Sequence, residues 1–348
     1  MTNHHIWSLR YIQIKKQHPR AIMSAIDVTP VHTSKADTRL GLIPKLRQRS
    51  RLTIKGNRAG IPSEQILSIS LGLMVHLGPA VIFTLILACF GRSLELILGS
   101  FIILSGLNLW LIIQLEEKHP SVELAPRSFQ AWFEGMSLVF IKGVICGSIV
   151  VAGGWLTLST LFTAILPTTL GYVTKESTWI TIFAAVMLTD FTYYGSHRFL
   201  NHGKAKNIIS KIFRKIHVTH HSVEVLDFLR GNVSSLWDTA VTGFQIPLAI
   251  IGTCLGMDLP SILISYGLVL MLQATHHANH TVNIGQLRFF FMDNHAHKLH
   301  HCPRGYMVNH GALFSLWDQA FGTYYEDWNL SSNYMQKHRI PIPIGLRR

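Results

Sequence analysis

Charged side chains are scarce in this sequence, and their scarcity argues against an ordinary soluble fold. Lys, Arg, Asp and Glu make up 14% of the 348 residues, against roughly a quarter in a typical soluble domain. Acidic residues are the rarer sign, 18 against 31 Lys and Arg, so the formal net charge is +13. Hydrophobic residues make up 48%. In so apolar a chain we interpret the positive charge as facing anionic lipid headgroups, and we expect no nucleic acid partner.

Cysteine is also scarce. The chain has four cysteines, and they form no C-x-x-C pair: Cys89, Cys146, Cys254 and Cys302. This argues against a disulfide framework and against a zinc ribbon, so a catalytic side that faces a reducing cytosol is expected.

Apolar runs begin after residue 62. A helix needs about 20 apolar residues to cross the hydrocarbon core, and four runs approach or exceed this length: 65–90, 94–115, 138–158 and 178–194. Two shorter runs, 240–255 and 261–275, predict a hairpin that enters the bilayer only partly. The predicted fold is therefore an all-α integral membrane helical bundle, with about four transmembrane helices plus a shorter apolar hairpin and a cytosolic histidine-rich cap.

This reading divides the chain into four regions. They are a basic, partly disordered N-terminal segment (1–62), transmembrane helices (63–176), a histidine-rich catalytic domain (177–330) and an extended tail (331–348). With the N-terminus in the cytosol, most Lys and Arg residues and every histidine cluster fall on the cytosolic side, as the positive-inside rule expects. We therefore expect a multi-pass protein of a bacterial inner membrane or the endoplasmic reticulum.

Histidine is what the sequence has in excess. Most of its 20 histidines lie between residues 190 and 301, and the pattern H-x-x-H-H occurs there twice. Residues at i, i+3 and i+4 share one face of a helix, so each pattern presents three imidazoles to one side. One tetrahedral ion takes four ligands, so this supply predicts two ions. Imidazoles favour Fe, Zn, Cu or Ni over Mg or Ca.

Two aspartates are candidates to orient the imidazoles. Asp190 lies seven residues, about two helical turns, before His197 on the same predicted face. Asp318 lies in a polar and aromatic cluster after the last histidine motif. Ordinary capping or ion pairing accounts for both carboxylates equally well.

The segment from about Ile182 to Thr323 resembles the fatty acid hydroxylase / sterol desaturase superfamily of membrane-bound di-metal oxygenases. The resemblance is carried by the two H-x-x-H-H motifs and by three further motifs: Asp190-x-x-Tyr193-Tyr194-x-x-His197-Arg198, His277-Ala-Asn279 and Trp317-Asp318-x-x-Phe321-Gly322-Thr323.

This resemblance implies two iron ions on the cytosolic face, with O₂ and two electrons used to hydroxylate a lipid alkyl chain. It implies metal ligands at His197, His202, His217, His220, His221, His297, His300 and His301. His276, His277 and His280 complete the candidate set, although at least one of them is expected beside the ligands rather than on a metal. Asp190, Asn279 and Asp318 are the candidate catalytic residues.

Several alternatives stay open. The five-residue spacing from His197 to His202 resembles that of the fatty acid and carotenoid hydroxylase branches of the family, and this resemblance favours hydroxylation without deciding it. A desaturase would use the same centre, and a metal-binding or transport membrane protein is a third interpretation. Zinc fits the same ligands and can displace iron in a purified sample. No cytochrome b5-like segment is visible, so a separate donor, either cytochrome b5-like or ferredoxin-type with a reductase, is expected. Fatty acid, sterol, alkylglycerol and carotenoid substrates all fit, and the sequence does not indicate an oligomeric state.

Overall fold

The structure, a computed structural model, describes residues 63–120, 130, 133, 135–137, 140–165, 177–204, 207–218, 220–222, 226–231, 243–301 and 308–325. All of them belong to one unit, Gly56–Arg348. Within these ranges the chain is helical, with two isolated β-bridges and no named strand, which agrees with the predicted all-α class. The predicted N-terminal segment 1–62 and tail 331–348 lie outside the described residues.

The first predicted apolar run forms two helices rather than one. α3 (Ser63–His76) and α4 (Gly78–Phe90) are bent by 49° at the break between them. Pro79 lies in the first turn of α4, where its missing N–H and fixed φ suit a helix start but would interrupt a continuous helix. After a short turn, Ser93 accepts a hydrogen bond from the Leu96 amide at 3.3 Å and caps α5 (Leu94–Lys118).

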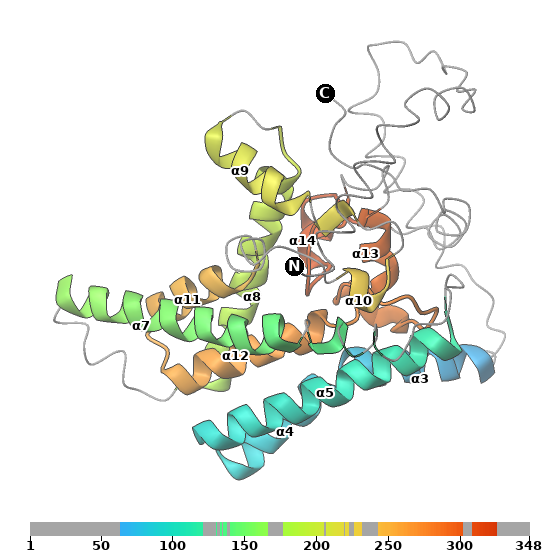
Figure 1. Ribbon diagram of the computed structural model, residues 1–348, viewed down its shortest axis with the longest axis horizontal. Helices are drawn as coiled ribbons and strands as arrows, with labels where there is room; N and C mark the ends of the chain where they lie inside the picture. Colours follow the sequence, from blue (N-terminus) through green and yellow to red (C-terminus); the bar gives the residue numbers. More distant parts are fainter. Residues whose placement is uncertain are drawn as a thin grey trace. The chain divides into compact units, whose positions relative to one another are not determined.

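A second group of helices packs around α12 (Leu259–Gln273). The π-helical η1 (Phe140–Cys146) leads into α7 (Gly147–Ile165), and α8 (Trp179–Ser196) and α11 (Gln245–Cys254) follow. α12 contacts α4, α5, α7, α8 and α11, which makes it the central helix of the bundle (Figure 1). Its Ile262, Tyr266 and Val269 are fully buried.

The outward faces of these helices are apolar. α4, α5 and α7 all expose large hydrophobic side chains, among them Leu85, Phe90, Ile103, Trp110, Ile149 and Leu156. An apolar surface of this extent on several neighbouring helices is typical of contact with lipid.

The described residues do not confirm all four predicted spans. Among the described residues, two helical segments are long and apolar enough to cross a membrane, namely α5 and Gly135–Ile165, and the bent pair α3–α4 makes a third if it counts as one span. α8 does not reach that standard, because its last turns are polar, from Thr189 and Asp190 to Ser196. α11 and α12 are short apolar helices, as expected for the hairpin.

Most of the clustered histidines lie on four short elements: η3 (His197–Asn201), α9 (Ile208–His217), η4 (His220–Ser222) and α13 (Asn294–His301). His276, His277 and His280 follow the end of α12. Three other short elements, α10 (Phe228–Gly231), η6 (Gly285–Phe289) and α14 (Leu316–Ala320), carry no histidine. η3 continues directly from α8, so the bundle itself places the first histidine of the site.

Candidate metal centre

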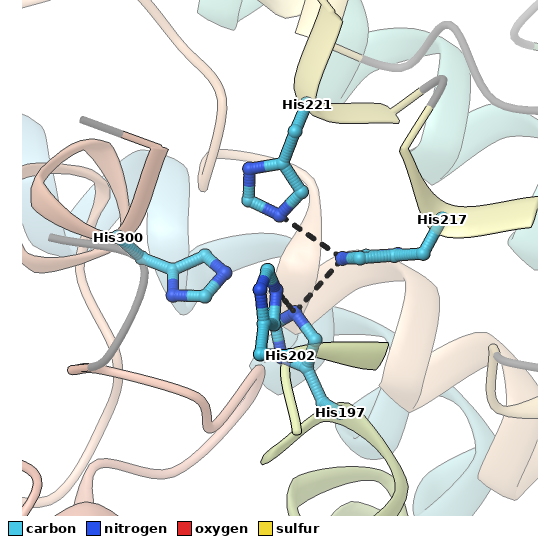
Figure 2. Close-up of side chains that lie close together, drawn as sticks. All are labelled: His197, His202, His217, His221 and His300. Carbon is cyan, nitrogen blue, oxygen red and sulfur yellow. Dashed lines mark hydrogen bonds between the residues drawn. The ribbon is translucent and has the colours of Figure 1, made fainter. Parts of the chain in front are cut away.

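Five imidazoles converge in a first group, which we call group A. It consists of His197, His202, His217, His221 and His300, and one ring nitrogen of each lies within 4.8 Å of the others. Figure 2 shows the five rings directed at a common point from η3, α9, η4 and α13. All five side chains are largely or fully withdrawn from solvent.

Four imidazoles form a second group, which we call group B: His220, His277, His297 and His301. Its ring nitrogens also lie within 4.8 Å of one another. The two groups are adjacent, because the rings of His221 in group A and His301 in group B stack with centroids 4.3 Å apart. Two neighbouring clusters of this kind suit a pair of ions.

Each H-x-x-H-H motif serves both groups. In the first motif His217 and His221 belong to group A and His220 belongs to group B. The second motif reverses the division, because His300 joins group A while its neighbours in the motif join group B. Neighbouring positions on a helix differ by about 100° in direction, so one turn can reach two adjacent ions.

The distances between ring nitrogens fit metal coordination. Nε2 of His197 lies 3.1 Å from Nε2 of both His202 and His217, and in group B Nε2 of His297 lies 3.0 Å from Nε2 of His277. Two nitrogens bound to one ion at about 2.0–2.1 Å stand about 2.9–3.4 Å apart in octahedral or tetrahedral geometry. The spacing therefore matches ligands that share an ion.

Two backbone carbonyls fix which ring nitrogen faces the cluster. Nδ1 of His197 donates to the His310 carbonyl at 2.6 Å, and Nδ1 of His300 donates to the Val308 carbonyl at 2.8 Å. A carbonyl can only accept, so the proton is on Nδ1 and the lone pair on Nε2 points inward. Nε2 of His300 is buried with no hydrogen-bond partner, as expected of a metal ligand.

Burial keeps these rings neutral. Desolvation, followed by the neighbouring imidazoles, holds the pKa of His197, His221 and His300 well below the ordinary 6.5. In group B, burial likewise lowers the pKa of His277, His297 and His301. Metals bind the neutral imidazole, so protons compete weakly for this site at neutral pH.

Asp318 acts on the rings only indirectly. Its carboxylate accepts hydrogen bonds from the backbone amides of His310 (2.8 Å) and Gly311 (2.7 Å) and from the Thr323 hydroxyl (2.7 Å). It therefore holds the loop whose carbonyl accepts from His197. Burial raises the pKa of Asp318 to about 6.

Asp190 is a structural anchor rather than a partner of an imidazole. Its two oxygens accept from the amides of Leu313 (2.8 Å) and Phe314 (3.0 Å) and from the Trp317 indole N–H (3.0 Å). These contacts join α8 to the segment that leads into α14. They also link two of the sequence motifs described above.

The histidines of the third motif separate. His277 belongs to group B, whereas His276 and His280 lie outside both groups. The His276 ring is 5.3 Å from that of His297, and Nδ1 of His280 contacts the Asn294 amide at 3.2 Å. Asn279 is buried, and its backbone amide donates to Glu116.

Glu116 escaped the sequence analysis. Glu116, near the end of α5, accepts from the backbone amides of Phe228 and Asn279, both at 2.7 Å, and so ties α5 to the segment that carries His277. The His310 ring lies 5.4 Å from that of His300. The polar pair Glu116-Glu117 at the end of an apolar run was the available signal for Glu116, whereas His310, in Asn309-His310-Gly311, is a polar contact that the sequence allowed.

A cavity of about 180 Å³ opens onto both groups. His217 of group A lines it together with His220, His277 and His297 of group B. Most of the remaining wall is apolar and comes from α5, η1, α10 and α12, including Leu109, Phe140, Val144, Phe228, Leu270 and Met271. An apolar chain can therefore approach the converging imidazoles.

Comparison with known proteins supports the resemblance seen in the sequence. Residues 182–323 match the family model described as fatty acid hydroxylase, which confirms that resemblance and indicates an oxidoreductase. Neither the curated proteins nor the solved structures gave a match.

Proposed function

We propose that this chain, whose residues 182–323 belong to the fatty acid hydroxylase family, is a membrane-bound di-iron oxygenase that hydroxylates a lipid alkyl chain. The observation that carries the proposal is the apolar cavity that ends at imidazoles of both groups. A purely structural metal site has no need of such an opening.

Groups A and B would each hold one iron ion. When bound, the pair supplies activation of O₂ and two-electron oxidation of a C–H bond, chemistry that amino acid side chains alone do not provide. We propose His276 and His280 as neighbours of the ligands, since they lie outside both groups.

The protein's own residues would position the substrate and exclude water. Leu109, Val144 and Met271 give the alkyl chain an apolar wall, and burial of that chain favours binding by roughly 0.8 kcal/mol per methylene. The carbonyls of Val308 and His310 keep two imidazoles in one orientation. A dry, rigid cavity then selects which carbon faces the metal centre.

The partners follow from this chemistry. The substrate would be a membrane lipid that enters from the bilayer, and the two electrons would come from a separate cytochrome b5-like or ferredoxin-type protein. The exposed apolar faces of α4, α5 and α7 and the basic excess of the chain support a multi-pass protein whose catalytic face is cytosolic.

Metal counting together with product analysis tests the proposal. The full chain, purified and loaded anaerobically with Fe(II), is expected to hold two iron ions and to form an O₂-dependent hydroxylated lipid when given a reductant. His300→Ala removes a group A ligand and is expected to leave about one tightly bound ion and no product.

His276→Ala is the matched control, because it removes a buried imidazole outside both groups. It is expected to keep two ions. A folded His300→Ala variant with full metal content and full activity would refute the proposal. A wild-type protein that binds one ion per chain would also refute it.

A further inference from the structure

α9 presents its apolar side chains to the outside of the molecule. At about 100° per residue, its five apolar side chains fall within one arc of roughly 140° around the helix: Ile208, Ile209, Ile212, Phe213 and Ile216. Ile208, Ile209 and Ile212 are 69%, 55% and 48% exposed. The two buried side chains of the helix, Ser210 and His217, lie outside this arc. α9 is therefore attached to the protein through a narrow polar strip, and most of its apolar face is left exposed.

The basic side chains of α9 form a second face. Lys211, Arg214 and Lys215 lie within an arc of about 100° that does not overlap the apolar one, and both lysines are exposed. No acidic residue occurs between Asp190 and Glu224, against six Lys and Arg residues. A helix with one apolar and one basic face is typical of helices that lie in the headgroup layer of a membrane.

The apolar face of α9 follows an exposed apolar surface on α8. The exposed side chains Ile180, Phe183, Leu188 and Phe191 lie within an arc of roughly 140° on α8, and Phe199 extends this exposure into η3. α9 packs against η3, beyond the end of α8 (Figure 1). Exposed apolar side chains thus accompany the chain from α8 to α9, as expected where one helix leaves a bilayer and the next lies on its surface.

An anionic bilayer satisfies both faces of α9. Lys215 lies about 20° from Ile208 around the helix, so its apolar stem can follow the isoleucines while its ammonium group reaches a lipid phosphate. The segment 1–62 carries 12 Lys and Arg residues against two acidic ones, so like charge repels it from the basic face. An acidic protein would pair with the lysines, but its acidic surface would not cover the isoleucines.

We propose that α9 lies in the headgroup layer of an anionic leaflet, with its exposed isoleucines among the acyl chains and with Lys211 and Lys215 at lipid phosphates. α9 ends at His217, a member of group A, so the membrane surface supports the helix that carries this imidazole. The inference uses only the surface of α9 and does not depend on the proposed oxygenase activity.

Photo-crosslinking of the full chain in lipid nanodiscs tests this placement. Benzoylphenylalanine replaces either Ile212 on the apolar face or Lys211 on the basic face, and both positions are exposed. The nanodiscs contain radiolabelled phosphatidylcholine, alone or mixed with phosphatidylglycerol. The probe at position 212 is expected to label lipid more strongly than the probe at position 211, and more strongly when phosphatidylglycerol is present.

Two double variants test the role of the lysines with the probe at position 212. Lys211→Gln with Lys215→Gln is expected to lower the labelling of lipid in anionic nanodiscs by about fivefold for each lysine that contacts the leaflet. Lys211→Arg with Lys215→Arg keeps both charges and is expected to keep the labelling. A probe at Ile149, an exposed position of α7, is the control: it is expected to label lipid equally in every variant that is folded and inserted.

The outcomes are distinct. Equal labelling of lipid from positions 212 and 211 overturns the inference, as does a protein that labels lipid from position 149 and from neither position of α9. Labelling that ignores both phosphatidylglycerol and the loss of the lysines refutes the anionic leaflet. A crosslink from position 212 to another part of this chain, or to an added acidic electron-donor protein, identifies a different occupant and also overturns the inference.

Discussion

The aspartate that holds the loop beside group A offers the sharpest test of how this centre is built. The carboxylate of Asp318 accepts from the amides of His310 and Gly311 and from the Thr323 hydroxyl. Asparagine has one acceptor oxygen and an NH₂ group that only donates. In Asp318→Asn the less costly orientation turns that NH₂ toward the Gly311 amide, which is then left unpaired.

The expected cost has two parts. One buried donor without a partner costs about 1–3 kcal/mol of folding free energy. The His310 carbonyl, which holds Nδ1 of His197 at 2.6 Å, also loses its anchor. Mutation of a residue that bonds a metal-bound histidine directly lowers metal affinity by about 10- to 100-fold. Asp318 acts through the His310 carbonyl, so Asp318→Asn is expected to lower metal affinity by about tenfold.

Asp190→Asn is the matched control. Asp190 also accepts three hydrogen bonds, from Leu313, Phe314 and Trp317, so the loss of stability should be similar. None of those residues is seen to hold an imidazole by its carbonyl. Metal affinity is measured by titration with a competing chelator, and stability by thermal unfolding in detergent. If the two variants bind metal equally well, the loop does not transmit the effect of Asp318.

Two further predictions concern burial. Glu116→Leu leaves the amides of Phe228 and Asn279 without their acceptor and is expected to lower the free energy of unfolding by about 2–6 kcal/mol. Glu116→Gln keeps an oxygen with two lone pairs and is expected to lower it far less. Similar melting temperatures for the two variants would contradict this prediction. The metal-free protein is expected to lose stability as the pH falls below 6.5. The histidines of the unfolded chain then bind protons, whereas the buried imidazoles of the folded protein stay neutral because their pKa values are lower. Burial raises the pKa of two aspartates, Asp318 and Asp190, and this acts in the opposite sense. Within groups A and B alone, seven histidines have lowered pKa values: His197, His202, His221, His277, His297, His300 and His301. Melting curves of chelator-treated protein at pH 8, 6 and 5 test this, and a flat profile refutes it.

The sequence alone determined the class of the protein and the composition of its centre. The scarcity of charge and the apolar runs predicted helices that contact lipid, because backbone polar groups in a bilayer must bond within their own segment. The spacing in H-x-x-H-H places three imidazoles on one side of a turn wherever that turn lies. These properties are local, so no knowledge of packing was needed to predict them.

Tertiary structure decided everything that depends on contact between distant segments. It placed His277 in group B and left His276 outside, although the two are adjacent in sequence. It assigned the Asp190 and Asp318 carboxylates to backbone amides rather than to imidazoles, and it brought Gln245 to the cavity that ends at the histidines. A motif fixes directions within one element, but the choice of partner is made by the packing of α5, α8 and α12 around it, which spacing does not encode.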